Sequence, residues 1–98
     1  MKVQNMTSQS TGREVANQFI ITDNYGNQYF QSYNTIIVKR ENFTPDKRDR
    51  QVYLDENAWA YSRTTGKYRN QFLGETKKET EAKINAGIYE LRDLNGAI

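Results

Sequence analysis

Three runs of β-branched and aromatic residues in the first half of the chain predict a small antiparallel sheet. They cover residues 16–22, 28–33 and 35–38. The residues between the first two runs are rich in Asp, Asn and Gly, so residues 16–33 are predicted to form a hairpin with a loop of about five residues. The third run follows a short corner at Tyr33 and Asn34. We therefore expect it to pair antiparallel with the second run.

The second half of the chain mixes strand and helix signals. Residues 51–54 form a short fourth apolar run, and Asp55 after it can cap a helical turn. Residues 64–74 begin with Thr, carry aromatic side chains four positions apart and stop at Gly, which predicts a short helix. Residues 88–94 alternate like a strand that returns to the sheet.

A capping box predicts a second helix between these segments. Thr76 is followed three residues later by Glu79, and Gly87 ends the segment. The order of elements predicts an α+β fold. It is a small, mainly antiparallel sheet of about five strands, with two short helices packed on one face.

The chain has 98 residues, which is the common size of a single domain. Residues 1–13 are polar and are expected to form a flexible N-terminal lead-in, leaving residues 14–98 as a single α+β domain. Only 36% of the residues are hydrophobic. Because so polar a small chain builds a thin core, a homo-oligomer is one expected state.

Cysteine and histidine are both absent from the sequence. They supply the commonest soft nucleophile, the commonest general base near neutral pH and the usual zinc and haem ligands. Glycine motifs of nucleotide-binding and hydrolase folds are absent as well. We therefore expect a binding protein and not an enzyme, with no catalytic residue, no metal and no cofactor. No stretch approaches the ~20 apolar residues of a membrane span, so no membrane contact is expected.

Aromatic and basic side chains alternate in residues 59–70, and this segment is the candidate ligand site. Aromatic rings can stack on bases while Arg and Lys neutralise phosphates, and the amides of a helix start favour an anion. In the alternative interpretation the aromatic residues belong to the core and the basic ones to a solvated surface. The candidate residues are Trp59, Tyr61, Arg63, Thr65, Lys67, Tyr68, Arg69 and Asn70.

A second basic segment covers residues 39–50. Phosphate contact through this segment is conceivable on charge alone. However, acidic residues offset most of its positive charge, which favours a solvated loop. Its basic residues are Lys39, Arg40, Lys47, Arg48 and Arg50.

Three blocks of the sequence resemble small uncharacterised proteins of tailed bacteriophages. They read NQFII at 17–21, YFQSYNTII at 29–37 and TTGKYRNQFLGE at 64–75. That family has no assigned activity, so the resemblance implies context and no site residues. It implies a phage protein working in the host bacterial cytoplasm, as a counter-defence protein, an accessory of DNA metabolism or a minor virion component.

The leading hypothesis is a non-enzymatic phage protein that binds and blocks or sequesters a bacterial defence component through residues 59–70. The expected partner is a host defence protein, such as a nuclease or a guide complex, or a nucleotide signal. Two alternatives remain open at this point. One is an accessory protein of phage replication that binds single-stranded nucleic acid, and the other is a minor structural protein of the virion.

Overall fold

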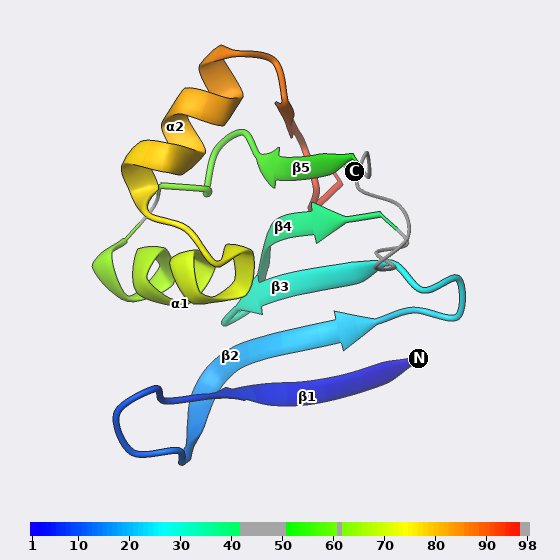
Figure 1. Cartoon of the computed structure of the whole chain (residues 1–98). Helices are drawn as coiled ribbons and strands as arrows, with labels where there is room; N and C mark the ends of the chain where they lie inside the picture. The colour runs from blue at the N-terminus through cyan, green and yellow to red at the C-terminus, as the bar shows by residue number, and fades with distance from the viewer. Residues whose placement is uncertain (42–50, 61, 97–98) are drawn as a thin grey trace.

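Six strands form one sheet whose spatial order follows the chain, β1-β2-β3-β4-β5-β6, in a computed structural model that describes residues 1–41, 51–60 and 62–96. Neighbouring strands are antiparallel from β1 to β5, and β6 runs parallel to β5. The strands are β1 (Lys2–Thr7), β2 (Glu14–Thr22), β3 (Gln28–Ser32), β4 (Thr35–Arg40), β5 (Val52–Asp55) and β6 (Tyr89–Arg92) (Figure 1).

Two helices, α1 (Arg63–Leu73) and α2 (Lys77–Asn85), connect the parallel pair in the described part of the chain. Parallel neighbours need such a crossover, because a tight turn would reverse the chain direction. Figure 1 shows α1 and α2 on the same side of the sheet. The predicted α+β class, with its mainly antiparallel sheet and its two helices, is therefore confirmed. The sheet has one strand more than predicted.

The extra strand is β1, and it corrects the expected flexible lead-in. Lys2–Thr7 pairs with β2 from Lys2 opposite Thr22 to Thr7 opposite Glu14. Most of its polar side chains are exposed, but Met6 is only 3% exposed and belongs to the core. The strand forms through backbone hydrogen bonds to β2 and one apolar anchor. Such an edge strand has little hydrophobic signal in its sequence.

The predicted hairpin and corner are both present. The Asp23 side chain accepts hydrogen bonds from the backbone amides of Tyr25 and Asn27, which closes the turn between β2 and β3. Tyr33 lies at the corner between β3 and β4 with φ of 56°, in the left-handed region. Its amide donates to the Asn17 carbonyl at 2.7 Å.

Both helices begin and end close to the predicted positions. The Thr76 hydroxyl accepts from the Glu79 amide while the Glu79 carboxylate accepts from the Thr76 amide, so the capping box is confirmed. The helix α1 begins one residue earlier than predicted, because Ser62 is its N-cap and accepts from the Thr65 amide. Gly74 ends α1 with φ of 71°.

The core lies between the sheet and the two helices. Phe30, Val38 and Leu54 have no exposed surface. Phe72 of α1 stacks on Phe30, with ring centroids 6.0 Å apart. Tyr68, one helical turn earlier, is 7% exposed. The contact between Phe72 and Phe30 fastens α1 to the middle of the sheet. It determines which face of α1 is left for a ligand.

A buried carboxylate holds the end of β5. Asp55 is 2% exposed, and its two oxygens accept from the amides of Asn57, Ala58 and Leu94 and from the Asn95 side chain. Asn95 in turn bonds both backbone groups of Ile36. One carboxylate thus ties the turn before α1 to the chain after β6, and through Asn95 to β4.

Neither helix in the described residues is long and apolar enough to cross a membrane.

A buried amide generates a first prediction on stability. Gln18 is 1% exposed, and neither polar atom of its side chain has a hydrogen-bond partner among the described residues. An unsatisfied buried polar group costs about 1–3 kcal/mol, so Gln18→Met should raise the free energy of unfolding by about 1 kcal/mol in urea titrations. The exposed Gln4→Met should change it by less than about 0.5 kcal/mol. A loss of stability in Gln18→Met would contradict this interpretation.

The Asp55 carboxylate generates a second prediction. In Asp55→Asn one carboxylate oxygen is replaced by an NH2 group, which must face N–H donors whichever way the side chain turns. The free energy of unfolding should therefore fall by about 2–3 kcal/mol. Glu56→Gln, at the exposed neighbouring position, is the matched control and should leave thermal unfolding nearly unchanged. Equal unfolding temperatures for the two variants would show that the carboxylate is not needed.

Candidate anion-binding site

Part of the predicted ligand site comes together in a single hollow at the start of α1. Arg63, Lys67, Arg69 and Asn70 all line it. We call it the basic hollow. It has a volume of about 630 Å³, and its lining consists of Ala60, Ser62, Arg63, Gly66, Lys67, Arg69, Asn70 and Lys77. These lining residues bring cations from both helices and no carboxylate.

Three of the other predicted residues, Trp59, Thr65 and Tyr68, do not line this hollow. Thr65 and Tyr68 are 3% and 7% exposed, on the buried side of α1. Trp59 is half-buried, and the Arg69 guanidinium lies over its ring at 5.4 Å. Tyr61 lies outside the described residues. Tyr68 is therefore too buried to stack on a base, and Arg69 occupies space over the Trp59 ring.

Helical spacing explains why the basic hollow forms. Residues three and four apart share a helix face, so Arg63, Lys67 and Asn70 line up along α1. Ser62 caps the helix, and the positive end of the helix dipole lies beside the hollow. The short loop after Gly74 then brings Lys77, the first residue of α2, to the same hollow.

Arg69 is the unusual member of the lining. It is 1% exposed, yet it forms no ion pair among the described residues. Its guanidinium donates to the Trp59 carbonyl and, at 2.9 Å, to Asn70 Oδ1, while Nε has no partner there. Burial lowers the pKa of the guanidinium, and Glu81 and Glu75 offset this only by longer-range attraction. A buried cation without a direct counter-charge costs free energy that a bound anion would recover.

Gly66 lies directly beside the buried guanidinium. A Cβ atom at this position would lie 3.6 Å from Arg69 Nη2, within van der Waals contact. Glycine in a helix interior costs about 0.5–1 kcal/mol relative to alanine. The absence of a side chain beside Arg69 therefore comes at a cost in helix stability.

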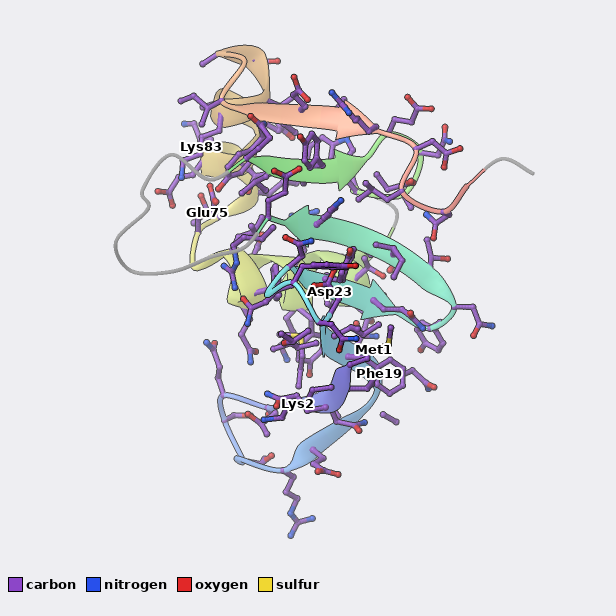
Figure 2. All side chains as sticks on the ribbon, turned by 90° about the vertical axis from the view of Figure 1, so that its right-hand side faces the viewer. Met1, Lys2, Phe19, Asp23, Glu75 and Lys83 are labelled. Carbon is purple, nitrogen blue, oxygen red and sulfur yellow. The ribbon has the colours of Figure 1, made fainter. Side chains whose placement is uncertain are left out.

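The loop before α2 is held in place by a buried contact with β6. The Glu75 side chain is 4% exposed and pairs with Lys83 of α2 at 3.4 Å (Figure 2). The Tyr89 hydroxyl donates to Glu75. Burial and the nearby carboxylate raise the pKa of the Tyr89 phenol, so it keeps its proton at neutral pH. This contact fixes where α2 starts and hence where Lys77 stands.

Lys77 remains available to a ligand. Its ion pair with Glu81, the one found among the described residues, spans 3.9 Å between side chains that are 54% and 51% exposed. Pairs of this kind contribute little in water and are screened by salt. An anion in the basic hollow can therefore compete with Glu81 for the ammonium group.

A second hollow adjoins the first at Ser62, which lines both. We call it the turn hollow, because it lies against the corner between β3 and β4. Its volume is about 440 Å³, and its lining consists of Ser32, Tyr33, Asn34, Thr35, Ile37, Ala58, Ser62 and Thr65. This lining holds no Asp, Glu, Lys or Arg, and it mixes hydroxyl, amide and apolar groups.

Sequence reasoning missed several lining residues. Ser62 lies two residues before the predicted helix and could have been identified as its N-cap. Lys77 directly follows the predicted cap Thr76, but nothing in the sequence shows that the second helix turns back beside the first. At the β3–β4 corner the sequence predicts a turn and no site. Only the tertiary packing brings the corner residues next to Ser62.

The basic segment of residues 39–50 is described only at its start. Lys39 and Arg40 belong to β4, and residues 42–50, with Lys47, Arg48 and Arg50, lie outside the described residues. Arg40 lies over the Phe72 ring at 4.3 Å and donates to Gln28 Oε1 at 2.7 Å. Neither Lys39 nor Arg40 lines the basic hollow.

No group of three or more His, Cys, Asp or Glu side chains that could hold a metal ion occurs in the parts of the chain that the structure describes. In comparisons with known proteins, the model of one family matches residues 1–87, and it is described as a family of unknown function (DUF8033). No curated protein and no solved structure matches the chain.

The position of Gly66 generates a prediction on stability. Gly66→Ala should raise the free energy of unfolding by about 0.5–1 kcal/mol, because alanine is the better helix former and the new methyl group meets no clash. Gly74→Ala is the matched control. It should lower stability, because Gly74 has a positive φ. Chemical denaturation of both variants decides this, and a destabilised Gly66→Ala would show that the helix needs the glycine.

Proposed function

The chain belongs to DUF8033, a family of unknown function, and from its own site we propose that it is a non-catalytic binding protein for a small phosphate-bearing ligand. The observation that carries the proposal is the Arg69 guanidinium, buried behind the basic hollow without an ion-pair partner among the described residues. Arg63, Lys67 and Lys77 surround the same space. A phosphate group in this position would neutralise charge that the protein otherwise leaves uncompensated.

Several physical terms favour phosphate over a singly charged anion. Phosphate carries close to two negative charges at neutral pH and offers several acceptor oxygens, so it can meet cations from different directions. Arg63 brings a planar fork of donors, while Lys67 and Lys77 bring mobile point charges. The N-terminus of α1 adds a favourable dipole.

The lining supports binding and not catalysis. It holds no carboxylate and no imidazole to act as a general base among the residues that the structure describes. The hydroxyl of Ser62 accepts from the Thr65 amide as a helix cap. Arginine remains protonated at all ordinary pH values, so Arg63 and Arg69 can attract and orient a ligand but cannot exchange protons with it.

Within the counter-defence role expected from the sequence, this site favours sequestration of a nucleotide signal. A hollow of about 630 Å³ has the size of small-molecule sites in general. Inhibition of a nuclease or a guide complex would more often use an exposed face of the protein. The proposal is thus a phage protein that withdraws a nucleotide from the host.

Binding of single-stranded nucleic acid is the second candidate function. The observation that favours it is on the sheet, where Lys39 lies 5.9 Å from the rings of both Tyr29 and Tyr53. Bases could stack on such a face. The nearby Arg92, however, is paired with Glu90 at 3.0 Å, which leaves fewer free cations there than in the basic hollow.

The proposal predicts saturable binding of inorganic phosphate that weakens as sodium chloride is raised. In NMR titrations the backbone amide signals of Gly66 and Lys67 should move. Lys77→Ala should weaken binding about tenfold, the value of one charge-assisted contact. Lys78→Ala removes the neighbouring exposed lysine, which does not line the hollow, and should leave the affinity unchanged.

Gly66→Ala gives an independent check on the same site. Its methyl group covers the Arg69 guanidinium, so phosphate should bind more weakly to this variant although its fold is more stable. Two results would contradict the proposal. One is the absence of any saturable shift with phosphate, and the other is an equal loss of affinity in Lys77→Ala and Lys78→Ala.

A further inference from the structure

We infer that the ligand is a nucleotide that lies across Ser62, with its phosphate in the basic hollow and its nucleoside half in the turn hollow. This inference rests on the proposed function and adds a second subsite to it. The two hollows meet at the N-cap of α1, because Ser62 lines both. A ligand with one anionic and one neutral half therefore finds matching surroundings on the two sides of this residue.

The difference in charge between the hollows sets the orientation. The basic hollow carries the cations of Arg63, Lys67 and Lys77. The described lining of the turn hollow holds no Asp, Glu, Lys or Arg. A phosphate gains far more electrostatic stabilisation in the basic hollow than in the turn hollow, so the neutral half of the ligand must occupy the turn hollow.

The turn hollow has the chemistry that a nucleoside requires. Ile37 and Ala58 are 1% and 8% exposed and give it an apolar floor against which a flat ring can pack. The Asn34 amide is exposed and carries both donors and an acceptor, which suits the edge of a base. The volume of about 440 Å³ lies within the range of small-molecule sites.

Two hydroxyl groups in this hollow have capacity left for a sugar. Ser32 Oγ and Thr65 Oγ1 are bonded to each other at 2.9 Å. That bond uses a single hydroxyl hydrogen, so the second one has no acceptor among the described contacts. A ribose hydroxyl could accept it while donating to the same pair.

Tyr33 is the first residue of the two-residue turn between the paired Ser32 and Thr35, and such a turn requires a positive φ at this position. A bulky residue in the left-handed region costs of order 1 kcal/mol, and glycine would fit the same corner without that cost. The Tyr33 amide donates to the Asn17 carbonyl, and the Tyr33 carbonyl accepts from Gln31 Nε2 at 2.7 Å. The ring is 57% exposed beside the hollow, where it can stack on a base.

The test uses isothermal titration calorimetry with four kinds of ligand: inorganic phosphate, ribose 5-phosphate, a nucleoside and its 5′-monophosphate. The nucleoside and the monophosphate are each measured with all four bases. At least one nucleotide should bind about tenfold or more tightly than ribose 5-phosphate, the contribution of one stacked base. In Tyr33→Gly and in Asn34→Ala this advantage should disappear, while the affinity for ribose 5-phosphate stays the same.

Tyr33→Gly is chosen because glycine adopts a positive φ without strain, so this variant should fold at least as well as the parent protein. Tyr25→Ala removes an aromatic ring that is 82% exposed in another turn, and it should bind every ligand as before. Loss of nucleotide affinity in Tyr25→Ala would show that the effect is not specific to the turn hollow and would overturn the inference.

The remaining outcomes separate the inference from the function on which it rests. If ribose 5-phosphate binds and no nucleotide binds more tightly, the second subsite is wrong and the phosphate site stands. If nucleosides bind as tightly as nucleotides, or if no phosphate compound binds, the phosphate site is wrong and the inference falls with it.

Discussion

The Asp55 carboxylate is the contact on which the arrangement of the site depends. It lies where β5 ends, and its oxygens organise the turn that leads toward α1 together with the chain beyond β6. Ala58, whose amide it accepts, lines the turn hollow. Because the carboxylate is buried and fully surrounded by donors, that turn has one favoured geometry. The position of both hollows at Ser62 follows from this local order.

Arg69 stabilises the fold through one contact and also leaves a buried charge uncompensated. Its bond to the Trp59 carbonyl fastens the same turn to α1, so the residue has a structural role. Its charge, however, lacks a direct counter-ion among the described residues. The neighbouring Gly66 makes the helix less stable than alanine would. Local departures from the most stable choice tend to gather at functional sites, and here two of them lie side by side.

Local patterns predicted much of the fold and only part of the site. The hairpin, the capping box at Thr76 and the short helices follow from turn formers, caps and spacing, which act within a few residues of one another. The strand β1 has a polar sequence and depends on backbone pairing with β2, so its pattern was too weak to predict it. In the segment 59–70 the structure brings the basic residues Arg63, Lys67 and Arg69 to one hollow, and their role in binding stays a prediction. The face that Tyr68 presents is decided by packing on the sheet, and the meeting of Lys77 with α1 is decided by a loop, neither of which a linear pattern contains.

The order of the strands also bears on when the site forms as the chain folds. From β1 to β5 every strand pairs with its neighbour in sequence, so these contacts close short loops at low entropic cost. The strand β6 pairs with β5 across a crossover that contains both helices, so its contacts are far less local. Folding speed falls as contacts become less local, so the pairing of β6 with β5 is expected late.

Both hollows include residues of that crossover, and the Asp55 carboxylate gains half of its donors only from the chain beyond β6. The sheet of β1 to β5 can therefore assemble before the binding surface does. A chain with β6 detached would keep most of its strands while losing the Leu94 and Asn95 donors that help to hold the turn at Asp55.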